Sequence, residues 1–211
     1  MNGNIEVHFV KSIMPGYFWI FPLENGLANV GIGMTMSDMK KNNVNLEKAM
    51  LDILANNPLF AERFKGAALV SQIKAWSLPL GSKRRIIHAD NALLVGDAAG
   101  LVDPFSGEGI GNAMFSGRLA AQVADEALAA GDTGEKFLFR YQERLWAAIG
   151  GELDISYKMQ QLGRMHWLLD MVVGKAARSG KAREAIAGTF TNEEAKQGYA
   201  SPLFYLKLLF S

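Results

Sequence analysis

The chain has 211 residues, 49% of them apolar and 20% charged, which is the balance of a globular protein with one domain or two small ones. Its formal net charge of +1 excludes the strongly basic field that draws proteins to nucleic acid, and the absence of cysteine excludes disulfides, thiolate nucleophiles and cysteine-based zinc sites. No signal-peptide pattern is visible and no apolar run reaches the roughly 20 residues that cross a bilayer, so we expect a cytoplasmic protein.

The first 34 residues predict an antiparallel sheet. Residues 5–11 alternate between apolar and other side chains, as in a half-buried strand. Residues 17–23 are aromatic and apolar, and residues 27–34 predict a return strand. Between them lies Glu24-Asn25-Gly26, a tight-turn signal, so we expect a hairpin with at least one further strand.

Helical and extended segments are expected up to residue 90. Asn45 is a suitable N-cap for a helix with its apolar residues on one face, namely Leu46, Met50, Ile53 and Leu54. Pro58 begins a second short helical piece. Residues 67–79 have the β-branched and aromatic composition of an extended segment, which ends at Pro79-Leu80-Gly81.

The second half of the chain predicts mainly helix. Residues 91–95 form a short apolar run that ends at a glycine, which indicates a buried strand of the kind found in parallel sheets. A long helix is expected over residues 107–130. Residues 134–172 are also helical in pattern, with a break expected at Gly150-Gly151, and residues 192–210 predict one or two short helices.

One segment of eighteen residues carries chemistry, because it combines a strand end, a carboxylate and a glycine-rich helix start. Gly96 at the strand end lets a ligand approach the backbone closely. Asp97 follows at the edge where open α/β sheets bind ligands, and its carboxylate can accept hydrogen bonds from sugar or polyol hydroxyls. Ala98, Ala99 and Gly100 are small and leave room for a bulky group above them.

Pro104 fixes a turn, and Gly107 and Gly109 then open the long helix. The first turn of a helix has unpaired N–H groups and the positive end of the helix dipole. These groups suit an acceptor that gains negative charge, such as the N1–C2=O edge of a reduced flavin. Each glycine alone is explained equally by close packing, but the ordered set favours a ligand site.

This run closely resembles the second FAD motif of the aromatic-hydroxylase-like flavoproteins, which reads GDAAG, then DP, then GEGIG. The resemblance implies that Asp97 contacts the ribityl chain of FAD. It also implies that the loop and helix start lie beside the isoalloxazine. The cofactor-binding residues implied in this way are Gly96, Asp97, Ala98, Pro104, Gly107, Gly109 and Ile110.

A second set of residues resembles the signature of the geranylgeranyl reductase family: Tyr17-x-Trp19-x-Phe21-Pro22, eight residues, then Gly31-x-Gly33. In that family the signature lies above the flavin and lines an isoprenoid channel. From the residues alone, the three aromatics share one face of a strand, and ordinary sheet core is the alternative. The resemblance implies these substrate-binding residues: Tyr17, Trp19, Phe21, Pro22, Gly31 and Gly33.

The chain has no G-x-G-x-x-G that would hold the ADP half of FAD, since Gly107-x-Gly109-x-Gly111 is followed by asparagine. We therefore expect a missing N-terminal FAD-binding half, supplied by a longer chain or by a separate polypeptide. The expected fold is α+β. Residues 1–90 form an antiparallel substrate-domain sheet, residues 91–132 the last strand and helix of a Rossmann-like FAD domain, and residues 133–211 a helical C-terminal region.

The resemblance implies an FAD-dependent oxidoreductase that reduces isoprenoid double bonds by hydride transfer from reduced flavin, with NADPH or a ferredoxin as electron donor. We assign no catalytic residue and no metal site, and we expect no nucleic-acid partner. Two alternatives stay open: an aromatic-type FAD monooxygenase, and a non-catalytic domain that binds lipid or a partner. Apolar surface left by the missing half predicts self-association. The apolar residues 203–210 leave peripheral membrane contact open.

Overall fold

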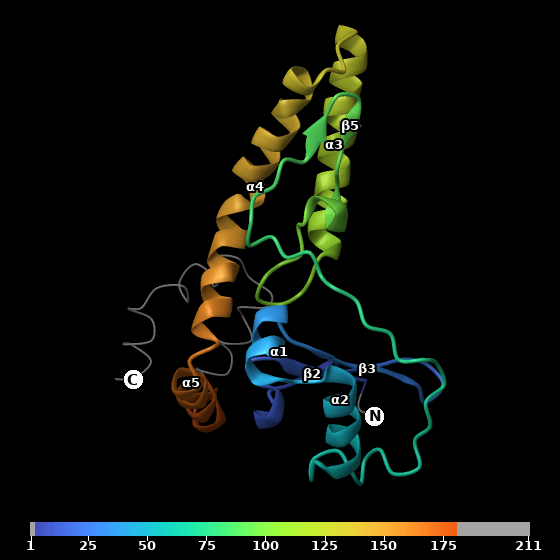
Figure 1. The fold of residues 1–211 in the computed structure, drawn as a ribbon, viewed down its shortest axis with the longest axis vertical. Helices are drawn as coiled ribbons and strands as arrows, with labels where there is room; N and C mark the ends of the chain where they lie inside the picture. Colours follow the sequence, from blue (N-terminus) through green and yellow to red (C-terminus); the bar gives the residue numbers. More distant parts are fainter. Residues whose placement is uncertain (1–2, 181–211) are drawn as a thin grey trace. The chain divides into compact units, whose positions relative to one another are not determined.

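A computed structural model describes residues 3–180 and divides the chain into two compact units, residues 1–75 and residues 76–211 (Figure 1). The described residues mix helices with small sheets, as the sequence predicts. The division falls at residue 75, whereas the sequence placed its first boundary at residue 90. That functional division, into residues 1–90, 91–132 and 133–211, stays a prediction. The short helices expected over residues 192–210 lie outside the described residues.

The first unit is built on a three-stranded antiparallel sheet in the order β1 (Glu6–His8), β2 (Tyr17–Pro22) and β3 (Ala28–Gly33). The turn between β2 and β3 has Asn25 at φ 58° and Gly26 at φ 74°. Two consecutive residues with positive φ match the twist of a two-residue hairpin loop, which explains the asparagine and glycine. The predicted hairpin and its third strand are confirmed.

One face of this sheet forms the core of the first unit. Phe18 and Ile20 of β2 are fully buried on it, and they pack in one cluster with α2 (Leu46–Asn56) and with Phe60. Asn45 caps α2 as predicted, since its side chain accepts a hydrogen bond of 2.9 Å from the Lys48 amide. The shorter helices of the unit are η1 (Lys11–Ile13) and α1 (Met36–Asn42).

Strand β1 turns its polar residues, not its apolar ones, toward this core. Glu6 lies opposite Ile20 in the sheet and His8 lies opposite Phe18, so both share the core-facing side. The His8 ring packs edge-on against Phe60, with ring centroids 4.8 Å apart. The apolar residues of β1 and its flanks are exposed on the other side, namely Ile5, Val7 and Phe9.

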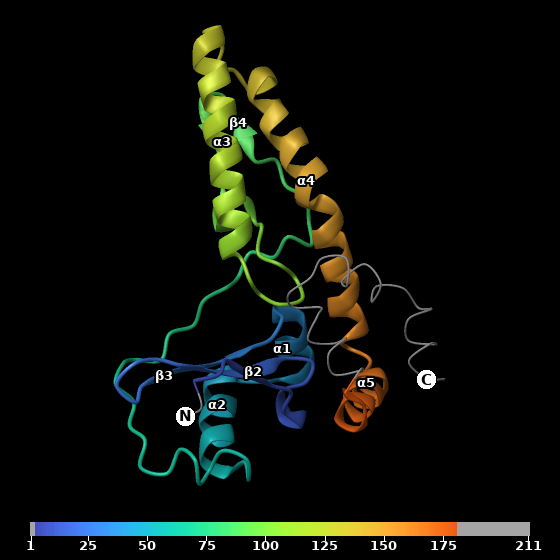
Figure 2. The same ribbon diagram turned by 180° about the vertical axis from the view of Figure 1, so that it is seen from behind.

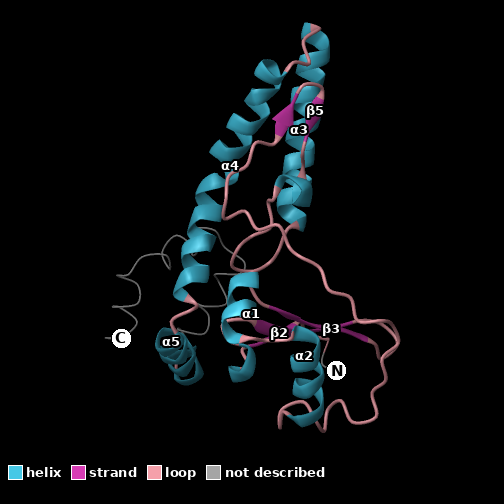
Figure 3. Cartoon of the chain, in the orientation of Figure 1, coloured by secondary structure: helices cyan, strands magenta, loops and turns pink. Residues whose placement is uncertain are grey.

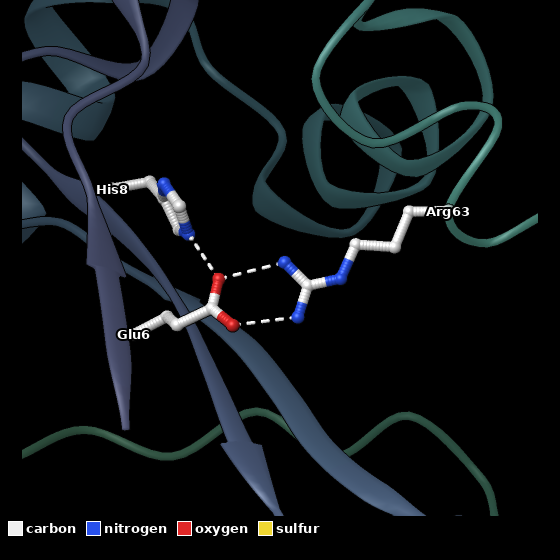
Figure 4. A network of polar contacts seen from close by, with 3 residues as sticks. All are labelled: Glu6, His8 and Arg63. Atoms are coloured by element: carbon white, nitrogen blue, oxygen red, sulfur yellow. Dashed lines mark hydrogen bonds and ion pairs between the residues drawn. The ribbon is translucent and has the colours of Figure 1, made fainter. Parts of the chain in front are cut away.

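Arg63 is what makes this inverted arrangement stable. Its guanidinium donates two hydrogen bonds, of 2.7 and 2.6 Å, to the two carboxylate oxygens of Glu6 (Figure 4). His8 Nε2 lies 3.0 Å from the same carboxylate. The hydrogen bonds from Arg63 hold the pKa of Glu6 at about 2, below its usual 4.5. A paired carboxylate can lie against an apolar core, and a solitary one could not.

The second unit centres on two long helices, α3 (Ile110–Ala130) and α4 (Glu135–Leu162), which pack side by side (Figures 1 and 2). A small antiparallel pair, β4 (His88–Ala89) and β5 (Ala92–Leu93), lies against α4, and η2 (Gly96–Ala99) lies against α3. The shared core holds Ile87 and Leu101 with the facing helix residues, among them Val123, Tyr141 and Leu145. The last described helix is α5 (His166–Arg178).

Four predicted features differ in the structure. The helical piece after Pro58 is a run of turns, and residues 67–79 are loop without strand pairing (Figure 3). Residues 91–95 form only a two-residue antiparallel strand, and Leu94 and Val95 are exposed. Helix α4 runs unbroken through Gly150-Gly151 and ends before Gly163.

Candidate functional site

The turn after β5 brings Asp97 to the surface beside the start of α3, with Gly96 buried next to it. Gly96 has φ 53°, a conformation that a side chain would strain, and a Cβ there would lie 3.0 Å from the Cβ of Ala113. Gly100 closes the turn at φ 68°. Asp97 and Ala98 lie exposed between them, while Ala99 is buried in the core. The GDAAG run is therefore a tight turn that presents one carboxylate to solvent.

Two buried hydroxyls hold the backbone that leads into this turn. The Gly96 amide donates a hydrogen bond of 3.0 Å to Ser116 Oγ on α3. The Tyr141 hydroxyl on α4 donates one of 2.8 Å to the carbonyl of Leu94. Both side chains are fully buried, and burial raises the pKa of Tyr141 to about 12. The position of Asp97 is thus fixed from two helices behind it.

The loop between the two halves of the motif is organised by a buried aspartate. Asp103 Oδ1 accepts hydrogen bonds from the Phe105 and Ser106 amides, at 3.0 and 2.8 Å, and from the Ser106 hydroxyl at 2.9 Å. Pro104 is buried, and its carbonyl accepts a hydrogen bond of 2.6 Å from Gln160 on α4. The Asp103-Pro104 pair therefore sets the loop geometry and contributes no free carboxylate.

The glycine-rich start of α3 leaves part of its backbone open. Glu108 reaches forward to accept a 3.0 Å hydrogen bond from the Gly111 amide, as a capping carboxylate does. Within residues 3–180 no acceptor is present for the amides of Gly109 and Ile110. A Cβ on Gly109 would lie 3.2 Å from Val102 and 3.4 Å from Asp97 Oδ1. Glycine at this position therefore keeps the space beside Asp97 clear.

A recess of about 240 Å³ opens at this point of the second unit. Four of the predicted cofactor-binding residues line it, namely Asp97, Gly107, Gly109 and Ile110, and the other lining residues are Leu78, Val102 and Ala113. The remaining predicted residues lie outside the recess: Gly96 and Pro104 are buried beneath the backbone, and Ala98 is exposed. The structure thus brings a carboxylate and two open amides to one apolar hollow.

The chemical groups of this recess are those that one edge of a flavin with its attached polyol chain would need. Open amides can donate to a carbonyl or ring nitrogen that gains charge, and the neighbouring carboxylate can accept from hydroxyl groups. The walls otherwise consist of glycine backbone and apolar side chains, which suits a flat ring. Among residues 3–180 no group of histidine, aspartate and glutamate is placed to hold a metal ion.

Five of the predicted substrate residues lie in the first unit on the sheet face opposite its core: Tyr17, Trp19, Phe21, Gly31 and Gly33. Pro22 alternates onto the core side, opposite Ala28, which packs against the buried cluster. Tyr17, Trp19 and Phe21 form a row along β2, with ring centroids 5.9 and 6.0 Å apart. None of them belongs to the buried cluster, which uses Phe18 and Ile20 from the alternate positions. Ordinary sheet core, the alternative explanation of these aromatics, does not describe them. We call this row the aromatic ladder.

The two glycines of the signature lie on the neighbouring strand beneath the rings of this ladder. Gly31 lies opposite Trp19 on β3, and a Cβ at Gly31 would overlap the indole ring. Gly33 lies opposite Tyr17, where a Cβ would meet ring atoms at an ordinary 3.6 Å. The indole therefore lies flat across the neighbouring strand. Pro22 ends β2, beside Ala28 of β3.

Several residues that shape these sites carry no signal of their own in the sequence. Tyr141 lies 47 positions from the carbonyl it holds, and Ser116 lies 20 positions from its amide partner. Leu78 enters the recess from a loop. Asn29 accepts a 2.9 Å hydrogen bond from the Trp19 indole N–H. Among these residues only Asn29 could be predicted from the sequence, because alternation along the strand puts it on the same face as Gly31.

Comparison with known proteins gives a consistent result. The family described as geranylgeranyl reductase catalytic domain matches residues 2–72. A digeranylgeranylglycerophospholipid reductase of Methanoculleus marisnigri is 38% identical over 162 residues, which are 75% of this chain and 38% of the relative. A reductase of the same name from Methanococcoides burtonii is 37% identical over 139 residues, 65% of this chain and 32% of that protein. Over its matched residues, this chain belongs to the geranylgeranyl reductase family.

The fold agrees with this assignment. A crystal structure of a geranylgeranyl bacteriochlorophyll reductase-like protein from Thermoplasma acidophilum superposes with a TM-score of 0.65 at 26% identity, covering 76% of this chain and 39% of that one. The chain thus spans about a third to two fifths of the length of these geranylgeranyl reductase relatives. No described helix is long and apolar enough to span a membrane.

Proposed function

We propose that this chain is part of an FAD-dependent oxidoreductase that reduces the double bonds of an isoprenoid lipid. The observation that carries the proposal is the recess of the second unit, where Asp97 and the open amides of Gly109 and Ile110 meet. The relatives are named as reductases of digeranylgeranylglycerophospholipid, and these names support both the reaction and the class of substrate.

In this proposal the residues of the recess bind and orient the cofactor. Asp97 accepts hydrogen bonds from the ribityl hydroxyls, and the amides of Gly109 and Ile110 donate to the N1–C2=O edge of the ring. Gly96, Ala98, Pro104 and Gly107 shape the backbone that surrounds it. When bound, FAD would supply hydride to one carbon of the alkene, with NADPH or a ferredoxin as its electron source. No residue of this chain is assigned as proton donor.

A partner that carries the ADP-binding segment, either further sequence in a longer chain or a separate polypeptide, is a further part of the proposal. The second unit exposes large apolar side chains near the recess, namely Leu94, Val95, Ile110 and Met114. Four exposed large apolar side chains in one region indicate a surface that is covered in the functional protein. We assign residues 91–132 to the C-terminal part of a Rossmann-like FAD domain that such a partner would complete.

The aromatic ladder is our candidate for the wall that receives the isoprenoid chain. Tyr17, Trp19 and Phe21 present a continuous aromatic surface on a face that the core of the first unit does not use. Flat aromatic rings bury a hydrocarbon chain without losing side-chain freedom, because they are already fixed. The supporting residues of this wall are Pro22, Gly31 and Gly33.

The FAD assignment is tested on the protein purified from its source organism, with whatever sequence or partner accompanies the chain there. We expect that protein to be yellow and to release FAD on denaturation. Asp97→Asn should weaken FAD binding about tenfold or more, since a hydrogen bond to a charged group contributes about 1.5–3 kcal/mol. Asp125→Asn, an exposed carboxylate of the same unit, is the matched control. A colourless protein would refute the flavin assignment.

The aromatic-type monooxygenase remains distinguishable by its chemistry. A monooxygenase consumes oxygen in proportion to product, whereas a reductase forms product without oxygen. We expect anaerobic turnover of a geranylgeranyl lipid with reduced flavin. Oxygen uptake coupled to product would overturn the reductase assignment.

A further inference from the structure

The Trp19 indole N–H is the one nitrogen donor along the aromatic ladder, and it has a fixed partner. Trp19 Nε1 donates a 2.9 Å hydrogen bond to Asn29 Oδ1. Asn29 lies on β3 opposite Phe21, two positions before Gly31, which seats the indole. The bond therefore runs diagonally across the sheet face from one strand to the next.

This hydrogen bond matters most when the ladder is covered. On the open sheet face, water can accept from an indole N–H, so an exposed bond to Asn29 adds little. Under a hydrocarbon chain, water is displaced and an indole without an acceptor carries the full desolvation cost of its donor. Indole nitrogen donates and cannot accept, so no rearrangement of the ring alone relieves that cost.

We propose that Asn29 is a positioning residue for isoprenoid binding, which holds the Trp19 indole flat on Gly31 and satisfies its N–H before the lipid arrives. This inference rests on the proposed function, since it needs the aromatic ladder to bind a prenyl chain. It goes further by making a polar, exposed residue a requirement for binding an apolar ligand.

Asn29→Leu tests this inference, because the role of Asn29 and simple hydrophobicity predict opposite changes in the affinity for geranylgeraniol. Leucine has the same number and branching of side-chain heavy atoms as asparagine and adds apolar surface beside the ladder. If hydrophobicity alone set affinity, Asn29→Leu would tighten the binding of geranylgeraniol. If Asn29 satisfies the indole, the same change should weaken binding about tenfold, the size expected for one buried donor left unpaired.

The experiment uses the same complete protein as the FAD test, labelled with ¹⁵N, with geranylgeraniol delivered from cyclodextrin. The indole N–H signal of Trp19 is assigned by its loss in Trp19→Phe. In the wild-type protein this N–H should shift on titration with geranylgeraniol and, once the lipid covers it, should exchange slowly with water. Asn29→Leu should speed its exchange and weaken binding. Asn29→Asp retains the acceptor and should keep the slow exchange. Asn56→Leu, an exposed asparagine on α2, is the control for added apolar surface.

Each result decides between defined outcomes. If the Trp19 indole signal of the wild-type protein does not shift on titration with geranylgeraniol, both the lipid wall and this inference are overturned. A wild-type response together with unchanged or tighter binding in Asn29→Leu would overturn the role of Asn29 alone and leave the wall standing. Slow exchange of the Trp19 N–H in Asn29→Leu would likewise contradict the inference.

Discussion

Glycines 31 and 33 are alike in the sequence, but they differ in what a side chain would meet. A methyl group at Gly31 would overlap the Trp19 indole, whereas one at Gly33 would sit at an ordinary 3.6 Å from ring atoms. We expect Gly31→Ala to lower the free energy of unfolding by about 1–3 kcal/mol, the cost of overpacking. Gly33→Ala should change it by much less. Denaturant unfolding of the two variants checks this, and equal effects would contradict the flat placement of the indole.

The Glu6 carboxylate predicts a specific acid sensitivity. Its pKa is lowered from 4.5 to about 2 in the folded chain, chiefly by the hydrogen bonds from Arg63, with His8 also facing it. A lowered folded pKa stabilises the chain above the unfolded value, and this contribution is lost as the pH falls from about 4.5 through 2. In Glu6→Gln the stability should therefore depend less on pH over this interval. Thermal melts at a series of pH values test it.

At the scale of elements, helices α3 and α4 support the recess from behind through Ser116 and Tyr141. Tyr141→Phe removes only the hydroxyl that donates to the Leu94 carbonyl, and should cost about 1 kcal/mol of stability. Tyr157→Phe is the matched control, because Tyr157 lies exposed on the same helix. Equal melting temperatures of the two variants would contradict the structural role of the Tyr141 hydroxyl.

The same tyrosine predicts an alkaline effect. Burial raises the pKa of Tyr141 from 10.0 to about 12, so the folded chain holds the neutral form more strongly than the unfolded chain does. This contribution is complete below pH 10 and is lost as the pH rises through 12. The wild-type chain should lose stability over that interval more steeply than Tyr141→Phe. If stability falls with pH equally in the two proteins, the predicted effect of Tyr141 is ruled out.

Helix α4 shows how tertiary packing can override a local signal. Two adjacent glycines are poor helix formers and predict a break at residues 150–151. Gly150 instead lies buried under the Arg84 guanidinium. A Cβ at this position would come within 3.0 Å of the guanidinium atoms, and Arg84 pairs with Asp154 at 2.7 Å. The glycine makes room for an arginine from a distant loop, so the helix continues. The sequence around residue 150 contains no sign of that arginine.

At the scale of the whole molecule, the exposed apolar residues of both units predict association. In the first unit they are Ile5, Val7 and Phe9, and in the second they include Leu94, Ile110 and Met114. We expect the 211-residue chain alone to self-associate at micromolar concentration, as measured by light scattering. A double variant, Ile110→Lys with Met114→Lys, should reduce this self-association. A monodisperse monomer in the wild type would contradict the expectation.

The sequence by itself determined those features of this protein that depend on neighbours along the chain. Asn25-Gly26 specified the hairpin, Asn45 specified the start of α2, and the spacing of glycines around Asp97 specified a turn and a helix start that face one recess. Such features follow from backbone conformations and caps that only a few residue types adopt.

Only the tertiary structure decided which way elements face and what holds them. The sequence of residues 5–11 shows an alternation of apolar and polar side chains, but not which of the two sets faces the core. That choice depended on Arg63, which lies 57 positions away from Glu6 and makes a carboxylate acceptable beside the core. Likewise the tyrosine behind the recess is 47 positions from its partner. Burial and pairing are set by groups that meet only after folding, because the free energy of a polar side chain depends on its surroundings and not on its place in the chain.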